Sequence, residues 1–231
     1  MKALAMIPAR SGSKGLKDKN ILDLAGKPMI AHSIIPALNC NLIDSVYLNS
    51  DSEKYLKIGE QFGAIGYKRS ENLSSYDTPM KSVIEDFCKY IKQTDNEIDC
   101  IVVLYPTYPF RDASDIGDFV QTFRSIGGER SIVGLKVPDT HPCLIYDRLD
   151  NGGLEQYISE KCTGMYRRQE YPVVYELTHW ICVVPIDGIS ELNSQMINEH
   201  TFGYLIGKDK IVVDVDIEKD YLYAKYILSQ N

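Results

Sequence analysis

The sequence predicts an α/β sandwich with a mostly parallel β-sheet. Short apolar runs of strand length alternate with amphipathic segments of helical length, and the connectors between them are short. The run at 100–104 reads CIVVL, and its β-branched residues are typical of a strand buried on both faces. Together these patterns indicate a central buried sheet with helices packed against it.

The expected elements follow this alternation along the chain. Pro28 suits the first turn of a helix, and Gly63 suits the position just past a helix end. Strands are expected at 3–7, 45–48, 100–104, 131–135, 180–184 and 211–213. Helices are expected at 29–38, 53–62, 79–91, 113–126 and 218–228.

One stretch interrupts the alternation. Residues 138–178 contain Pro, Gly, Asp and aromatic residues with no long periodic run, and roughly forty residues is too long for a plain loop in a compact domain. We therefore expect a single domain over 1–231, with 138–178 as an inserted arm or small lobe. Such an arm would cover the active site, contact a second subunit, or do both.

Composition excludes several classes of protein. The chain has 231 residues, a net charge of −7 and a sequence pI of about 5.2, which argues against a nucleic-acid-binding protein. No apolar stretch approaches the ~20 residues of a membrane span, and the N-terminus lacks the features of a signal peptide. Without an export signal, the six irregularly spaced cysteines are expected to be reduced thiols in a cytoplasmic protein.

The strongest motif directly follows the first expected strand. Residues 8–20 read PARSGSKGLKDKN and hold four cationic side chains and two glycines. Glycines let backbone N–H groups approach an anion, and cations neutralise its charge, so this loop suits a di- or triphosphate. The pattern is neither a Walker A loop nor G-x-G-x-x-G. A solvated basic turn is the alternative, but in an acidic protein a loop after strand one favours phosphate binding.

A pair of carboxylates follows the last apolar run. Alternation would place Asp214 and Asp216 on one side if the strand at 211–213 continues through them. Mg²⁺ typically takes one or two carboxylates plus phosphate oxygens, so this pair suits a divalent cation. The alternative is a surface loop in which Asp216 caps the final helix.

Two further motifs carry groups suited to ligands. Residues 105–111 read YPTYPFR and follow the strongest strand, at the sheet edge where ligands bind in open α/β folds; a proline-stiffened turn is the alternative. Arg167 and Arg168 are adjacent within 138–178, and an arginine binds a carboxylate in a bidentate fork. A structural salt bridge is the alternative for the second motif.

These motifs together resemble the acylneuraminate cytidylyltransferases (CMP-sialic acid synthetases). The segment 7–21 is similar to the family signature, and 214–220 also fits; these two motifs are the specific ones. The segments 49–52, 62–74 and 168–169 are similar too, while 105–111 matches the family's QPTSPLR imperfectly. The resemblance covers nearly the whole chain and implies a three-layer α/β/α, Rossmann-like nucleotidyltransferase fold.

The resemblance implies a reaction and a set of site residues. The family transfers CMP from CTP to the anomeric hydroxyl of a nine-carbon 2-keto sugar acid and releases pyrophosphate. By this resemblance Arg10 and Lys14 hold the triphosphate, Asp214 and Asp216 hold Mg²⁺, and the arm forms a homodimer. The expected substrate contacts are Ala9, Ser11, Gly12, Lys19, Asn20, Asp51, Thr78, Tyr105, Thr107, Arg168 (near the sugar carboxylate) and Gln169.

The departures from the family pattern fall on the sugar side. Tyr105 stands where the family usually has Gln, Leu144 where a Lys is common, and residues 178–180 read THW in place of NGA. A Trp in place of Ala would fill the pocket if its side chain points inward. We therefore expect an acceptor other than ordinary N-acetylneuraminate. The rival interpretations are a cytidylyltransferase for a shorter keto acid such as 3-deoxy-manno-octulosonate, and a non-catalytic nucleotide-binding module.

Overall fold

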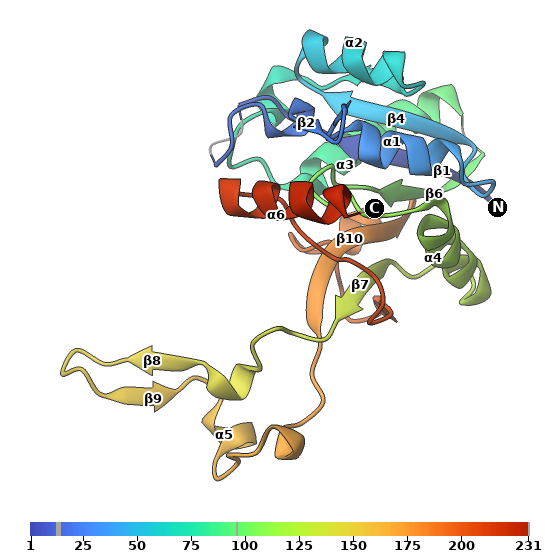
Figure 1. The fold of residues 1–231 in the computed structure, drawn as a ribbon. Coiled ribbons are helices and arrows are strands. Elements are labelled where there is room, and N and C mark those ends of the chain that lie inside the picture. Colours follow the sequence, from blue (N-terminus) through green and yellow to red (C-terminus); the bar gives the residue numbers. More distant parts are fainter. Residues whose placement is uncertain (13–14, 96, 231) are drawn as a thin grey trace.

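A single mixed sheet forms the centre of the molecule. The computed structural model describes residues 1–12, 15–95 and 97–230. The sheet has seven strands in the order β11-β7-β10-β6-β1-β4-β5 (Figure 1). β10 runs antiparallel to both of its neighbours, and the remaining pairs are parallel, as predicted. The strands are β1 (Lys2–Pro8), β4 (Ser45–Ser50), β5 (Ile65–Lys68), β6 (Ile98–Val103), β7 (Ile132–Lys136), β10 (Glu176–Pro185) and β11 (Phe202–Leu205).

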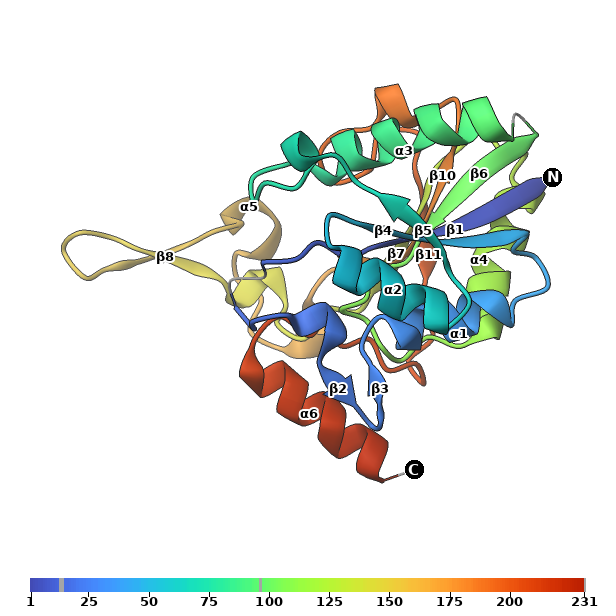
Figure 2. The same cartoon turned by 90° about the horizontal axis from the view of Figure 1, so that it is seen from above.

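Helices cover both faces of the sheet, which confirms the three-layer prediction (Figure 2). One face carries α1 (Ala31–Leu38), α2 (Glu53–Gln61) and α4 (Ala113–Ser125), and the other carries α3 (Met80–Thr94). The last helix, α6 (Glu218–Ser229), packs instead on a small hairpin of β2 (Asp23–Leu24) and β3 (Lys27–Pro28).

Alternation along β1 separates the two cores. Ala3, Ala5 and Ile7 belong to the core beneath α1, α2 and α4, whereas Leu4 and Met6 belong to the core beneath α3. Successive residues of a strand point to opposite faces, so a continuously apolar strand supplies both layers. This explains why the first run of the sequence has no polar residue between Ala3 and Ile7.

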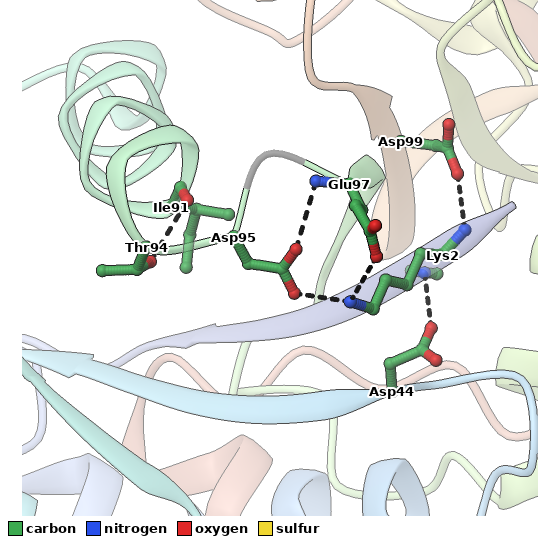
Figure 3. Close-up of polar contacts among 8 residues, drawn as sticks. Lys2, Asp44, Ile91, Thr94, Asp95, Glu97 and Asp99 are labelled. Carbon is green, nitrogen blue, oxygen red and sulfur yellow. Dashed lines mark hydrogen bonds and ion pairs between the residues drawn. The ribbon is translucent and has the colours of Figure 1, made fainter.

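An ionic cluster closes the amino-terminal end of the sheet (Figure 3). Lys2 Nζ lies 2.7 Å from an oxygen of Asp95 and 3.4 Å from one of Glu97, while the Lys2 backbone N–H donates to Asp99. The Ala3 N–H donates to Asp44 at 2.8 Å. These contacts give hydrogen-bond partners to the backbone N–H groups at the start of β1. The opposite, carboxyl end of the strand remains for ligand binding.

The arm, defined here as residues 138–175, projects away from the sheet (Figure 1). It contains the hairpin β8 (Tyr146–Arg148) and β9 (Leu154–Gln156), the short helix α5 (Ser159–Cys162) and a 3₁₀ turn at Arg168–Glu170. A disulfide joins Cys143 to Cys162. The expectation of six reduced thiols is therefore wrong for this pair, because folding of the arm brings together two cysteines that are distant in sequence.

Two edge regions also differ from the prediction. Residues 211–216 form no ladder, so the strand expected at 211–213 is wrong; this segment crosses the sheet end, where the Val215 N–H donates to the Thr107 carbonyl at 2.8 Å. The edge strands β5 and β11 were missed. All of their residues are partly buried or exposed, and edge strands with one partner lack the continuous apolar signal of a central strand.

No helix in the described part of the chain combines the length and apolar character needed to cross a membrane.

Candidate active site

A cavity of about 490 Å³ opens at the carboxyl ends of β1 and β6. The strand order reverses at this point, since the chain runs from β1 outward to β4 and β5 and then returns to β6 on the other side. Such a switch point is where open α/β sheets bind ligands. Of the residues predicted from the sequence, seven line the cavity: Arg10, Lys19, Asn20, Tyr105, Thr107, Asp214 and Asp216.

The other predicted residues lie elsewhere. Lys14 lies outside the described residues. Five further predicted residues do not line the cavity: Ala9, Ser11, Gly12, Asp51 and Thr78. Tyr76 and Met80, on either side of Thr78, do line it. Arg168 and Gln169 are exposed on the arm and do not line the cavity of their own chain.

Cationic side chains gather at one end of the cavity, here called the charged end. The Arg10 guanidinium lies over the Tyr76 ring, 4.9 Å from its centroid, and the Arg10 carbonyl accepts a 3.0 Å hydrogen bond from Asn20. Lys19 Nζ forms an ion pair with Asp216. A Cβ at Gly15 would lie 2.6 Å from the Asp216 carbonyl oxygen, so only glycine lets the loop approach the carboxylate pair this closely.

Asp51 supports the loop from behind. Its two carboxylate oxygens accept hydrogen bonds from the Ser11 N–H at 2.7 Å and the Ser11 hydroxyl at 2.6 Å. Burial alone would raise the pKa of Asp51, but these hydrogen bonds outweigh it and hold the pKa below its ordinary value. Both residues were predicted to touch substrate, and in the structure they touch each other.

The carboxylate pair faces the same cavity from the segment before α6. Asp214 hydrogen-bonds Thr107 and Tyr108, and its pKa is raised by burial and by the neighbouring Asp216. The Asp216 N–H donates to Asp220 at 3.0 Å. The alternative in which Asp216 caps α6 is wrong, because the Asp220 carboxylate accepts the N–H groups of Asp216 and Ile217, just before this helix.

A divalent cation fits this pair of carboxylates. No group of three or more His, Cys, Asp or Glu side chains gathers as a metal site among the described residues. Mg²⁺ needs no such group, since it takes one or two carboxylates and completes its coordination with water and phosphate oxygens. Two converging carboxylates beside a cationic loop match that donor set.

Another part of the cavity wall, here called the aromatic end, is formed by Tyr105, Tyr108 and His179, and Tyr108 also hydrogen-bonds Asp214. The Tyr105 and His179 rings lie 5.6 Å apart between centroids. Burial raises the pKa values of the Tyr105 and Tyr108 hydroxyls, which stay neutral. Trp180 points the other way, into the core against Phe119, so the idea that Trp fills the pocket is wrong, and His179 lines the cavity instead.

Arg111 lies behind the aromatic end and does not line the cavity. Its guanidinium is buried and donates to the Ser33 hydroxyl at 2.6 Å, to the Tyr105 carbonyl at 2.7 Å and to the Trp180 carbonyl. Burial lowers the pKa of Arg111 to about 9. This arginine joins the loop after β6 to β10.

Sequence reasoning missed several lining residues, among them Arg69, Tyr76, Met80, Tyr108 and His179. Arg69 is buried, donates from Nε to the Asn49 side-chain oxygen at 2.7 Å, and has a pKa lowered by burial to about 10. The sequence around an isolated residue such as Arg69 has no motif that would predict its place in a cavity. For His179 the sequence did carry a hint, because this residue is one of the departures from the family pattern at 178–180.

A protein-family model described as cytidylyltransferase matches residues 4–181. The chain belongs to the cytidylyltransferase family. This membership makes it a nucleotidyltransferase.

Similar proteins cover this cytidylyltransferase from end to end. A CMP-N,N'-diacetyllegionaminic acid synthase of Legionella pneumophila is 28% identical over 100% of this chain and 98% of its own length. An N-acylneuraminate cytidylyltransferase of Streptococcus agalactiae serotype III is 30% identical over 97% of this chain, which spans 52% of that relative. A solved CMP:2-keto-3-deoxy-manno-octonic acid synthetase complexed with CTP aligns with a TM-score of 0.71 at 17% identity, covering 100% of this chain and 99% of that one, and supports the fold.

Proposed function

We propose that this cytidylyltransferase transfers CMP from CTP to the anomeric hydroxyl of a nonulosonic, sialic-acid-like sugar acid and releases pyrophosphate. The observation that carries the proposal is one cavity with a charged end and an aromatic end. The charged end suits a triphosphate, and the aromatic end leaves room beside it for a second substrate. Relatives over the full chain are named for CMP-sugar acid synthesis, which supports the same reaction.

The chain's residues would act by positioning and by neutralising charge. In-line attack of a sugar oxygen on the α-phosphate develops negative charge on the leaving pyrophosphate, which Arg10 and Lys19 are placed to neutralise. Lys14 belongs to the same proposal from its place in the loop sequence. Asn20 and Asp51 would act indirectly by fixing the loop backbone.

Asp214 and Asp216 would hold Mg²⁺ when it is bound. Bound there, Mg²⁺ would supply Lewis-acid chemistry: neutralisation of phosphate charge and activation of the attacking hydroxyl. Without it, Lys19 partly neutralises the pair through Asp216. A non-catalytic nucleotide-binding module would have no use for this metal-binding pair.

The acceptor we propose differs from ordinary N-acetylneuraminate. Tyr105 and His179 form an aromatic surface in the cavity where the family pattern has Gln and Gly. Leu144, which replaces a common Lys, lies half-exposed on the arm. A nonulosonic acid with fewer hydroxyls and more acetamido groups matches such a surface better than a heavily hydroxylated sugar.

We also propose a homodimer that forms through the arm. Leu154, Tyr157, Tyr166 and Val173 are 70%, 66%, 75% and 80% exposed on one projecting segment. Isolated monomers rarely present so many large apolar side chains together. A second copy would cover them and bring Arg168 and Gln169 toward a cavity. Sedimentation should give a dimer, and Leu154→Asp with Val173→Asp should give a monomer; a monomeric wild type would contradict this.

We place the protein in the cytoplasm, where its proposed donor CTP is found. The disulfide between Cys143 and Cys162 is of a kind that the thiols of that compartment reduce, so the pair has two states, the disulfide of the structure and two free thiols. Thiol titration of unfolded protein, extracted with and without rapid alkylation, would distinguish the two states. Four further cysteines are free and buried.

The test of the reaction is pyrophosphate release from CTP and Mg²⁺ with a panel of acceptors. The panel should hold N-acetylneuraminate, its diacetamido relatives and the eight-carbon keto acid. Release with a nine-carbon acid supports the proposal, and the preferred member names the substrate. Faster release with the eight-carbon acid would favour the shorter-substrate alternative. CTP binding without release with any acceptor would favour the binding module.

A further inference from the structure

We propose that His179 is a specificity-determining residue whose Nδ1 accepts a hydrogen bond from a hydroxyl or amide N–H of the acceptor. This inference rests on the proposed function and extends it to a side chain at the aromatic end of the cavity.

The first observation is the place of His179 in the sheet. Thr178 of β10 pairs with Gly134 of β7. The next paired residue of β10 is Cys182, whose partner is Val133, the residue adjacent to Gly134. Residues 179–181 therefore form an irregularity in the ladder.

Irregular strand positions of this kind often lie beside active sites, because they redirect a side chain. β10 pairs with β6 only from Cys182 onward, so His179 lies beyond the end of β6 and beside the loop that follows it. There its ring meets Tyr105, and both line the cavity.

The second observation is the orientation of the imidazole. His179 Nε2 lies 3.1 Å from the Gln195 carbonyl oxygen. A carbonyl oxygen only accepts, so Nε2 carries the hydrogen, and in the neutral ring Nδ1 holds a lone pair. Nδ1 has no hydrogen-bond partner in the part of the chain that the structure describes. His179 thus brings to the cavity lining a ring whose neutral form has one unused hydrogen-bond acceptor.

The third observation is that neighbouring groups hold this wall in place. Arg111 donates to the carbonyls of Tyr105 and of Trp180, the residue after His179. The Gln195 carbonyl belongs to a turn whose N–H groups are held by Asn193, at 2.9 Å for Gln195 and 3.2 Å for Ile197. A group held on both sides makes a selective contact, because it cannot shift to suit a different ligand.

We assign the contact to the acceptor because the cations and carboxylates that suit the triphosphate of CTP are other residues of the cavity. Arg10, Lys19 and the carboxylate pair form the charged end, whereas His179 is flanked by Tyr105 and a backbone carbonyl. A lone pair on Nδ1 gives nothing to a triphosphate, whose oxygens also accept hydrogen bonds. It suits a sugar acid, whose hydroxyl and acetamido groups are donors.

The test compares His179→Ala, His179→Leu and His179→Asn with the wild-type protein. Loss of one hydrogen bond to a buried donor should raise the KM for the acceptor about tenfold in the Ala and Leu variants. The KM for CTP should stay within about twofold. The Asn side-chain oxygen can occupy the position of Nδ1, so this variant should recover most of the affinity. His200→Ala removes an exposed histidine and should change neither constant.

Acceptor analogues that each lack one donor group complete the test. One analogue should bind the wild-type protein about tenfold more weakly than the full acceptor does, and its affinity should not fall further in His179→Ala. The group missing from that analogue would be the hydrogen-bond donor to His179. Equal losses for CTP and acceptor, no rescue by Asn, or additive losses for every analogue would overturn the inference. Calorimetric titration of acceptor into protein saturated with a non-hydrolysable CTP analogue gives the same comparison without turnover. Absence of pyrophosphate release would then count against the proposed function alone.

Discussion

The two ends of the cavity are built in different ways. The charged end comes from two short stretches, the loop 8–20 and the segment 214–216, and each is recognisable in the sequence. The aromatic end joins Tyr105 to His179 across two strands and depends on buried Arg111, which donates to Trp180, 69 positions further along the chain. Charge acts over distance and tolerates imprecise placement, whereas a wall that selects by shape needs exact neighbours. We therefore expect substitutions to separate the two ends cleanly.

The largest effect is expected from Asp216→Ala at the charged end. Losing a carboxylate that would hold Mg²⁺ removes several kcal/mol of charge stabilisation, so Mg²⁺-dependent turnover should fall about 100- to 1000-fold. The Asp216 side chain is well exposed, so the fold should remain intact. Pyrophosphate release and circular dichroism measure the two quantities. Asp139→Ala, on an almost fully exposed aspartate, is the control, and near-wild-type rates for Asp216→Ala would refute the metal assignment.

Arg111→Met should damage the aromatic end by destabilising its support. The Ser33 hydroxyl and the Tyr105 and Trp180 carbonyls would lose a donor in a buried site, and we expect the free energy of unfolding to fall by about 3 kcal/mol. Urea unfolding measures this, and the KM for the acceptor should rise more than that for CTP. The exposed Arg130, which also donates to a carbonyl, gives the matched control Arg130→Met, with a change below about 0.5 kcal/mol. Equal losses in both variants would contradict the assignment.

Arg10→Ala should weaken CTP binding and spare the acceptor. A charge-assisted hydrogen bond contributes about 1.5–3 kcal/mol, which corresponds to a KM for CTP raised roughly 10- to 100-fold. Steady-state kinetics with each substrate varied in turn would show the split. Lys17 is an exposed cation of the same loop that does not line the cavity, and Lys17→Ala should have little effect. Similar losses in both variants would favour the solvated basic turn over a phosphate site.

The smallest effect is expected from Asp51, which acts through Ser11. Because the folded-state pKa of Asp51 lies below its ordinary value of 3.8, its carboxylate stabilises the fold above that value. The contribution is lost as pH falls through the folded pKa. Asp51→Asn should therefore lower stability by about 1 kcal/mol at pH 7 and by progressively less below pH ~4, as measured by thermal unfolding. A difference that does not change with pH would contradict this role.

Most of the sheet was predictable because buried strands have a strong local signal. The continuous apolar runs that became β1 and β6 identified the central strands without further information. The half-exposed edge strands β5 and β11 gave no such pattern, and the apolar run at 211–213 looked like a strand although it pairs with none. Hydropathy reports burial, but pairing depends on where the neighbouring strand ends.

The sequence by itself determined the layered fold and the chemical character of the charged end, because period, charge and glycine spacing are properties of short segments. Tertiary structure alone decided that His179 and not Trp180 faces the cavity, that Arg111 supports the wall, that Asp51 holds Ser11, and that Cys143 meets Cys162. Each of these contacts joins residues from separate elements. The distances between these residues depend on the order of strands in the sheet and on the irregularity in β10. No local sequence pattern encodes either of these features.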